Sequence, residues 1–456
     1  MPERLPVGPY ETLEVPGVGA VPWYVLPFNK NGRSTGPQTR DDLIARVGRE
    51  GFTDVFLFSH GWNNDWLVAT ERYRDFFGGF MELRRKHELP KPDPYRPLLV
   101  GIFWPSTALT FGEERGPGFA AAVAAGSVEK DLGVGAALSE AEEVGEELPD
   151  DEAEDFYRLA QKEELTTAEA QRLAEILAPL YRDPEAPEAV EEAEAPRPQD
   201  LLELAREFAR ASGAETAPAG GGFADQPVLA PEAAGLAALD PRNLIRPFTV
   251  WKMKDRAGVV GAKGVGPALR DLLAAAPGAR FHLVGHSYGC RVILSALASE
   301  APPRPVDSIL LLQAAVNLWC FAPDVAGKEF PGGYQEIPGR CRLPVATTFT
   351  RHDRALRRLF HLAVRRRRDL GEVEIAAAAD QPPSNFSALG GYGPAGPPVA
   401  VVDIHDPVER YPELAPGSGH EIVAIRAHRT ISGHGDISNP STWWLEHELV
   451  ARSAGI

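Results

Sequence analysis

A chain of 456 residues with 44% hydrophobic and 24% charged side chains has the composition of an ordinary globular protein, which excludes a disordered or fibrous one. The formal net charge of −17 at pH 7 provides no basic field for phosphates, so we expect no nucleic-acid partner. The charge is also local, because residues 129–208 contain 25 acidic against 7 basic side chains and the remainder is close to neutral. Such an acidic block indicates an inserted segment.

The sequence contains no segment typical of secretion or membrane insertion. Residues 1–19 include acidic residues and prolines but no apolar core of a signal peptide. Apolar stretches elsewhere are broken by charge, proline or a turn within about 12 residues, so we expect no integral membrane segment. The irregular spacing of Cys290, Cys320 and Cys341 fits a reducing compartment better than a disulfide framework. We therefore expect a cytoplasmic protein.

The first predicted elements form a strand, a turn and a helix, followed by another strand. Residues 54–59 (DVFLFS) are an apolar run of strand length, and the turn residues 60–64 (HGWNN) follow them. A helix is predicted from Asp65, a suitable N-cap residue, to Glu88, because aromatic residues recur there at helical spacing. Residues 97–104 (PLLVGIFW) are predicted to be the next buried strand.

Residues 107–247 differ from the rest of the chain and are predicted to be an insertion. A helix is expected at 166–180, where Thr166 and Glu169 have the spacing of a capping box and apolar residues share one face. Residues 183–198 (DPEAPEAVEEAEAPRP) have almost nothing to bury and are predicted to be a flexible linker. We expect an acidic, mainly helical insertion.

A second block of alternating strands and helices begins near residue 248. Its strands are predicted at 280–284, 306–314, 342–350, 398–404 and 421–427, and its helices at 288–300, 354–367 and 442–452, with a further helix that ends at Gly278. Strands that alternate with helices favour an α/β fold, in which helices cover both faces of a mostly parallel central sheet.

One serine lies in a pattern that is typical of a nucleophile, Gly285-His286-Ser287-Tyr288-Gly289. The pattern alone is only suggestive, but the four residues before it (FHLV) are strand-like and the eight after it (CRVILSAL) are helical. A strand that turns sharply into a helix at a serine is the context of a nucleophile elbow. The flanking glycines tolerate a strained backbone, and the helix N-terminus supplies N–H groups. The alternative interpretation is an N-capping serine in a turn.

A serine hydroxyl is a weak nucleophile and needs a base, which an acid must orient. Asp353 is favoured as the acid because it lies just past a predicted buried strand and before a helix. Its alternative role is a helix N-cap. Asp403 and Asp406, near the end of a later strand, are the reserve candidates. Asp307 stands at the start of its strand, which is the wrong end of a parallel sheet for a site.

The favoured base is His434, in the loop Ser-Gly-His-Gly-Asp between the last predicted strand and the final helix. A glycine-flanked loop allows its imidazole to reach over the edge of the sheet. His428 is the second choice, at the end of a strand, whereas His352 and His286 have the wrong order or direction. A lone histidine in a loop is commonly a solvated surface residue. Asp436 is expected to orient this loop or to cap the helix.

Together these features resemble the serine hydrolases of the α/β-hydrolase fold, and most of all bacterial hydrolases of unknown function with a His-Gly-aromatic-Asn-Asn turn. The residues that carry the resemblance are His60-Gly61, Gly285-x-Ser287-x-Gly289, Asp353 and His434. The resemblance covers residues 50–106 and 248–456. It implies an α/β-hydrolase core formed by residues 1–106 and 248–456, with residues 107–247 as a cap or lid.

The resemblance also implies an oxyanion hole. Its donors would be the backbone N–H groups of Trp62 and Tyr288, and the turn at His60 and Gly61 would support them. The implied reaction is hydrolysis of a carboxylic ester through an acyl-enzyme, with a small-molecule acyl substrate and without a metal or an organic cofactor. Two alternatives stay open: a peptidase or amidase that uses the same three residues, and a binding protein without turnover. The oligomeric state is left open.

Overall fold

The computed structural model of the chain describes residues 6–62, 64–106, 144–145, 148–162, 164–181, 197–213, 240–325, 331–363, 382 and 384–456. The chain divides into two compact units. The first comprises Met1–Thr107, Met253–Arg357 and Ala379–Ile456, and the second comprises Ala108–Lys252 and Arg358–Ala378. The expected boundary at residue 248 therefore falls inside helix α10 (Arg242–Val260), and residues 358–378, which we expected in the core, belong to the second unit.

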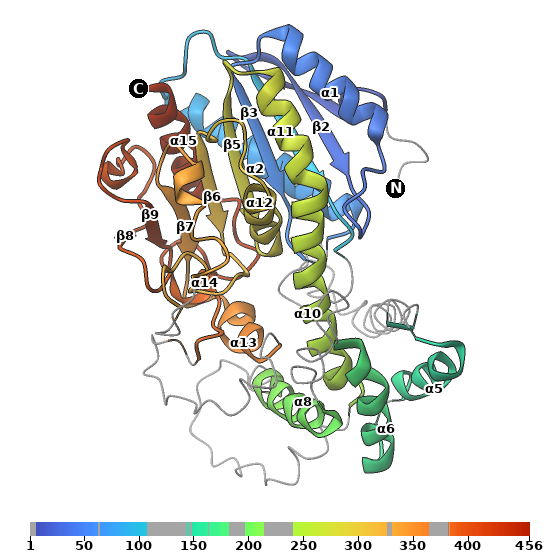
Figure 1. Ribbon diagram of the computed structural model, residues 1–456. Helices are drawn as coiled ribbons and strands as arrows, with labels where there is room; N and C mark the ends of the chain where they lie inside the picture. Colours follow the sequence, from blue (N-terminus) through green and yellow to red (C-terminus); the bar gives the residue numbers. More distant parts are fainter. Residues whose placement is uncertain are drawn as a thin grey trace, which may run out of the picture. The chain divides into compact units, whose positions relative to one another are not determined.

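A nine-stranded mixed sheet forms the centre of the first unit (Figure 1). The strand order is β1-β2-β4-β3-β5-β6-β7-β9-β8, in which β1 and β2 are antiparallel and the other neighbouring pairs are parallel. The strands are β1 (Glu11–Val15), β2 (Gly19–Pro27), β3 (Asp54–Ser59), β4 (Pro97–Phe103), β5 (Arg280–His286), β6 (Ser308–Leu312), β7 (Val345–Phe349), β8 (Val399–Asp403) and β9 (Ile422–Arg426). The expected α/β architecture with a mostly parallel sheet is confirmed.

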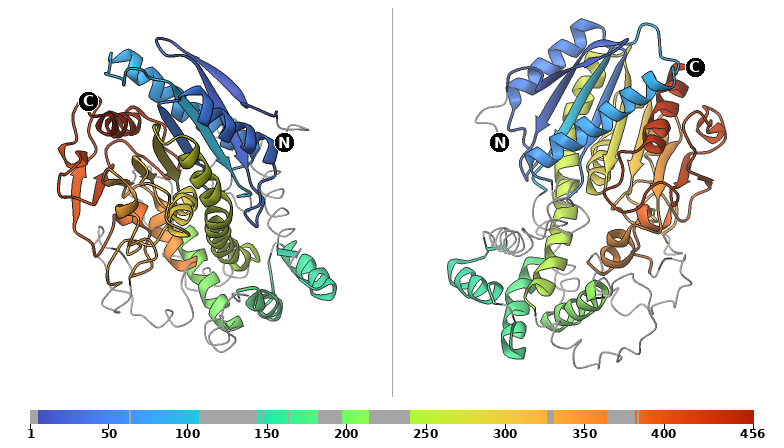
Figure 2. Two further views of the ribbon diagram at one scale, coloured as in Figure 1. Left: turned by 45° about the horizontal axis from the view of Figure 1, so that its top comes forward. Right: turned by 180° about the vertical axis from the view of Figure 1, so that it is seen from behind.

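Helices cover both faces of this sheet (Figures 1 and 2). One face packs against α1 (Pro37–Glu50), α11 (Gly266–Ala275) and α12 (Tyr288–Ala298), and the other against α2 (Trp66–Lys86) and α15 (Pro440–Ala454). Because both faces are covered, every residue of β3, β4 and β6 is buried. Burial on two sides explains why these strands are continuous apolar runs rather than alternating ones.

Capping residues fix where two of these helices begin. Asp65 precedes α2, and its carboxylate accepts a hydrogen bond from the Val68 N–H at 2.8 Å, so the predicted N-cap is confirmed. The closing helix begins two residues earlier than predicted, because Asn439 caps it with bonds from the N–H groups of Ser441 and Thr442. Asp436 therefore does not cap this helix.

The N-terminal strands and the first helix, β1, β2 and α1, were not predicted. Strand β2 contains prolines at both 22 and 27, which obscured an otherwise apolar strand that is buried from residue 21 to 27. Proline at 22 lies where β2 pairs with β1 alone, because pairing with β4 begins at Trp23, so one side of β2 is an edge at this position. These elements widen the parallel sheet on the side away from β5.

Several shorter elements complete the described residues. They are η2 (Gly261–Val265), η3 (Pro338–Arg340), η4 (Ala355–Leu359), α13 (Phe360–Ala363), α14 (Leu389–Tyr392) and η6 (Pro412–Leu414). The helix predicted at 354–367 corresponds to η4 and α13, and its residues from 364 onward lie outside the described part. The helix predicted to reach Gly278 ends at Ala275. None of the helices in the described part of the chain combines the length and hydropathy that a membrane span requires.

The described part of the second unit is helical and has its own apolar core. It contains α5 (Asp150–Ala160), α6 (Thr167–Leu177), η1 (Ala178–Tyr181), α8 (Pro198–Gly213) and the first part of α10. The capping box predicted at Thr166 and Glu169 is present, and Leu173 and Ile176 of the predicted apolar face are fully buried beside Phe156. Residue 198, expected in a linker, begins α8, whereas residues 183–196 lie outside the described part.

Candidate active site

The predicted nucleophile Ser287 lies between the end of β5 and the start of α12. Its backbone has φ 55° and ψ −124°, a conformation that is strained for a residue with a side chain. The chain is held in this turn by a hydrogen bond from the Ser287 N–H to the Leu312 carbonyl at 3.1 Å. The Ser287 carbonyl accepts from the N–H groups of Cys290 at 3.1 Å and Ala315 at 3.2 Å. Three backbone hydrogen bonds therefore hold the turn in this conformation.

The two glycines of the pentapeptide are required by space. A side chain at Gly285 would place its Cβ 2.7 Å from the Cα of Cys290, and one at Gly289 would place it 2.1 Å from the Ser59 carbonyl oxygen. Neither backbone neighbour can move without breaking the sheet or the helix. The glycines therefore allow α12 to start directly against β3, with its N-terminus close to Ser287.

The structure brings Ser287, His434 and Asp353 together in one hydrogen-bonded series. His434 Nε2 lies 2.8 Å from Ser287 Oγ, and His434 Nδ1 lies 2.7 Å from Asp353 Oδ2. An ionised carboxylate can only accept, so with Asp353 in that form Nδ1 donates to it, and Nε2 of a neutral ring then accepts the Ser287 hydroxyl proton. All three side chains are buried, so little water competes for these bonds.

The contacts of Asp353 fit both of the roles that its sequence position allows. It follows β7, and its Oδ1 accepts the Leu356 N–H at 2.9 Å, which caps the turn after it. Its Oδ2 faces His434. The reserve candidates lie elsewhere: Asp403 is 3.6 Å from Arg426, and Asp406 accepts from Arg429 at 2.8 Å on the surface. The geometry thus favours the first choice.

The alternative base, His428, does not reach the serine. His428 lies two residues beyond the end of β9, and its Nδ1 accepts the Arg351 N–H at 3.1 Å. Asp436 accepts both the N–H of Ser432 at 2.9 Å and its hydroxyl at 2.8 Å, which closes the loop around His434. Of the two roles expected for Asp436, the structure therefore places it in the loop.

His286 has a position that the sequence analysis missed. We set His286 aside as the base because of its order or direction, and its Nε2 lies 2.9 Å from the backbone carbonyl of His434 and must donate to it. Burial, and next the nearby His434, lower the pKa of His286 well below its usual range, so the ring is neutral. The residue before Ser287 thus anchors the loop that contains His434. The sequence feature that could have indicated this role is a histidine at the end of a buried strand, where a polar ring needs a hydrogen-bond partner.

The turn after β3 lies directly against the nucleophile. A Cβ at Gly61 would stand 2.8 Å from the Cβ of Ser287, so this backbone approaches the serine as closely as a glycine permits. The rings of Trp62 and Tyr288 are 6.2 Å apart, which places the two expected oxyanion donors in neighbouring segments. Asn63 lies outside the described residues.

Two side chains set the direction of this turn. Asn64 Nδ2 donates to the carbonyls of Gly61 at 2.9 Å and Trp62 at 2.8 Å. The Gly61 carbonyl also faces His60 Nδ1 at 2.7 Å. In a trans peptide the N–H points opposite to the carbonyl, so the Trp62 N–H points away from these two side chains. The role of Asn64 was not predicted.

His60 is a structural support of this turn. It is completely buried, and its ring stacks on Trp104 with the centroids 5.5 Å apart. Its Nε2 accepts the Trp104 N–H at 3.3 Å, which leaves Nδ1 to donate to Gly61. Burial lowers the pKa of His60 to about 3, so the ring is neutral and holds the turn without a charge.

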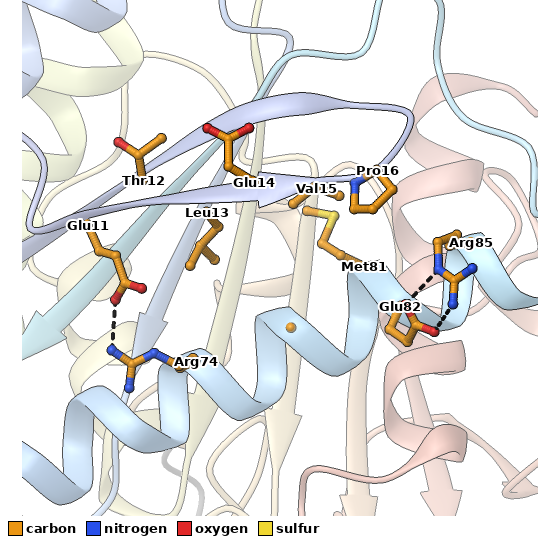
Figure 3. Close-up of a pocket in the computed structure, with 11 residues that line it drawn as sticks. Glu11, Thr12, Leu13, Glu14, Val15, Pro16, Arg74, Met81, Glu82 and Arg85 are labelled. Atoms are coloured by element: carbon orange, nitrogen blue, oxygen red, sulfur yellow. Dashed lines mark hydrogen bonds and ion pairs between the residues drawn. The ribbon is translucent and has the colours of Figure 1, made fainter.

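A groove at the edge of the sheet is separate from this site (Figure 3). It has a volume of about 310 Å³ and lies between β1 and α2, where Leu13 and Met81 face it and ion pairs join Glu11 to Arg74 and Glu82 to Arg85. None of its lining residues belongs to the Ser287 series. Among the residues that the structure describes, no three histidine, cysteine or acidic side chains are grouped to hold a metal.

Comparisons with protein-family models, with curated proteins and with solved structures find no match for this chain. The site is therefore interpreted from its own geometry. That geometry comprises a serine at a strained strand–helix turn, a histidine within hydrogen-bond distance of it, and a buried carboxylate behind the histidine. A glycine turn lies against the serine. This arrangement can activate a hydroxyl for attack on an electrophilic carbon.

Proposed function

We propose that the chain is a serine hydrolase with the α/β-hydrolase fold, which cleaves carboxylic esters of small molecules through an acyl-enzyme. The observation that carries the proposal is the unbroken series of hydrogen bonds from Ser287 through His434 to Asp353, at 2.8 and 2.7 Å. The serine also has the strained backbone and the adjacent helix N-terminus of a nucleophile elbow.

In the proposed reaction, Ser287 Oγ attacks the acyl carbonyl carbon while its proton passes to His434 Nε2. Asp353 stabilises the imidazolium that forms. The backbone N–H groups of Trp62 and Tyr288 stabilise the negative oxygen of the tetrahedral intermediate. When this intermediate collapses, the leaving alcohol takes the proton from His434. Water then attacks the acyl-enzyme by the same path and releases the acid.

The α/β-hydrolase fold is part of the proposal. It is supported by the order of the parallel strands, in which β5 carries Ser287 at its carboxyl end and has β3, with the glycine turn, beside it. Residues 108–252 of the second unit interrupt the chain between β4 and β5, the described part of this unit has its own helical core, and we propose that the unit acts as a cap. The free cysteines are compatible with the proposed cytoplasmic location.

A fluorophosphonate probe tests the proposal directly, because it reacts covalently with activated serines. We expect the wild-type protein to be labelled and Ser287→Ala to remain unlabelled. Ser308→Ala is the matched control, since it removes another buried serine hydroxyl that is hydrogen-bonded to a histidine. Absence of labelling in the folded wild-type protein would exclude the serine hydrolase.

Substrate preference separates the ester hydrolase from a peptidase or amidase. We expect p-nitrophenyl esters of short acyl chains to be hydrolysed and the corresponding anilides to react much more slowly. Equal turnover of the two series would favour the amidase instead. Stoichiometric labelling without any turnover would indicate a protein that keeps the site but does not release an acyl group.

A further inference from the structure

Gln313 is a buried polar residue with an unusual backbone, directly after β6 (Ser308–Leu312). Its φ of 46° lies in the left-handed region, which a residue with a side chain rarely adopts. Such a conformation persists only when surrounding contacts hold it. Those contacts lead to the acid of the proposed active site.

Gln313 makes four hydrogen bonds with buried partners. Its side-chain Nε2 donates to Asp353 Oδ2 at 3.0 Å and to the Gly390 carbonyl at 3.3 Å. Its backbone N–H donates to Thr348 Oγ1 at 3.1 Å, and the Thr348 hydroxyl donates to Gln313 Oε1 at 3.0 Å. Gln313, Asp353 and Thr348 have no exposed surface.

These bonds permit one orientation of the amide. The Thr348 oxygen already accepts the Gln313 backbone N–H, so its hydroxyl proton is available to donate to Oε1. The NH₂ group must then face Asp353 and Gly390, both of which are acceptors. The reverse orientation would place Oε1 against a carboxylate and a carbonyl, with no proton between them.

We propose that Gln313 is a positioning residue for the acid, which holds the Asp353 carboxylate in the orientation that His434 needs. The inference rests on the proposed serine hydrolase function. Asp353 Oδ2 is shared between His434 and Gln313, and Oδ1 is fixed by the Leu356 N–H. The carboxylate is therefore restrained at both oxygens.

The consequence for catalysis follows from the shared oxygen. Without the Gln313 donor, the carboxylate can rotate about its Cβ–Cγ bond and present a poorer angle to His434 Nδ1. The imidazolium that forms when Ser287 attacks would be less stabilised, whereas substrate binding would be unaffected. Loss of Gln313 should therefore lower kcat and leave KM unchanged.

Two substitutions at this position separate chemistry from folding. Gln313→Met keeps most of the volume but removes the donor. Gln313→Gly also removes the donor but relieves the positive φ, so backbone strain cannot account for a shared defect. We expect both variants to lose about 10- to 100-fold in kcat on a p-nitrophenyl ester, the range expected for one hydrogen bond to a charged group.

Thr348 provides an independent test that leaves Gln313 in place. Thr348→Val removes the hydroxyl that orients the amide, and we expect a smaller loss of kcat in the same direction. Thr348→Ser retains the hydroxyl and should restore most of that loss. Thr347→Val is the matched control. The hydroxyl of Thr347, next to Thr348 in the chain, is also buried but has no hydrogen-bond partner among the described residues. We expect Thr347→Val to have wild-type kcat.

The outcomes distinguish this inference from the proposed function. If the wild-type protein is neither labelled by a fluorophosphonate nor active, the proposed function fails and the role of Gln313 falls with it. If the wild-type protein is active and Gln313→Met and Gln313→Gly match its kcat, only the positioning role is overturned. Loss of kcat in Thr347→Val equal to that in Thr348→Val would also overturn it, because the effect would then be structural.

Discussion

The carboxyl ends and the amino ends of the parallel strands form two opposite rims of the sheet, here called the carboxyl edge and the amino edge. Each of them holds an aspartate, a histidine and a serine that are joined by hydrogen bonds. The carboxyl edge has the series that ends at Ser287. At the amino edge, His282 of β5 lies 3.2 Å from Asp54 Oδ1 and 2.7 Å from Ser308 Oγ. Both sets are buried. The same residue types and hydrogen bonds therefore do not by themselves indicate an active site, and the differences between the two edges are what support the proposed site at Ser287.

The first difference is the backbone of the serine. Ser308 is the first residue of β6 and pairs in register with His282 on the neighbouring strand. Its peptide groups belong to a regular sheet. Ser287 instead occupies a strained turn with φ 55°, and the α12 N-terminus begins immediately after it. A developing oxyanion at Ser287 would meet helix N–H groups, whereas Ser308 is followed by the rest of β6 and not by a helix.

The second difference is the charge around the acid. Arg280 binds both oxygens of Asp54 at 2.8 Å. Burial alone would raise the pKa of Asp54, but hydrogen bonds from His282 and Arg280 outweigh it and lower the pKa to about 2. Asp353 is contacted by the Gln313 amide, the Leu356 N–H and His434. Its carboxylate has no arginine or lysine partner among the described residues, so its charge is available to an imidazolium.

Asp353→Asn is the strongest test of this comparison. An amide at 353 can donate to His434 Nδ1 and so favour the tautomer that carries its proton on Nε2, which cannot accept from Ser287. If the proposed function holds, we expect kcat on a p-nitrophenyl ester to fall about 10⁴-fold, as the same substitution does in known Ser-His-Asp triads, while the protein stays folded. A loss of less than about tenfold would show that Asp353 does not orient the base.

Much of the parallel sheet was predictable because its central strands are short apolar runs bounded by turns. The run at 54–59 coincides with β3, and the serine turn was identified from the strand before it and the helix after it. Chain order then led to Asp353 and His434, which the structure brings together with Ser287. For the strands and the serine turn a local pattern contained the information, and for Asp353 and His434 their order along the chain did.

Other features depend on contacts between distant segments and could not be predicted. Strand β2 is interrupted by prolines, and its burial comes from β4 and the helices around it. Gln313 lies 40 residues before the acid that it contacts, and His286 lies 148 residues before the carbonyl that it binds. The only sequence feature that indicated a role for Gln313 or His286 is that each is a polar residue at the end of an apolar strand. The sequence cannot show which partner such a residue finds.

Asp54→Asn should produce the opposite result from Asp353→Asn. The substitution replaces the fully buried carboxylate that binds Arg280 with a neutral amide. The Arg280 side chain, which is 22% exposed, then has lost its charged partner. We expect the free energy of unfolding to fall by about 3 kcal/mol in urea titrations, with labelling of Ser287 unchanged in the folded protein. Loss of labelling without loss of stability would contradict the division of roles between the two edges.

A third buried carboxyl group, Glu446 on α15, differs from Asp54, which binds Arg280, and from Asp353, which binds His434. It is 1% exposed, and neither of its oxygens has a hydrogen-bond partner among the described residues. Burial raises the pKa of Glu446 from its ordinary value of 4.5 to about 7, although nearby His282 opposes the shift. The folded protein therefore keeps a proton that the unfolded chain releases at lower pH.

The raised pKa of Glu446 makes stability fall with increasing pH. Its contribution is fully present below pH 4.5, is lost as the pH rises to about 7, and is constant above that. Glu446→Gln stays neutral at every pH, so the variant should gain about 2 to 3 kcal/mol over the wild-type protein between pH 5 and pH 8. Urea unfolding of both proteins at the two pH values measures this difference, in which other titrating groups cancel. Parallel stability profiles would mean that Glu446 is ionised in the fold and has a partner, which would remove its contrast with Asp54 and Asp353.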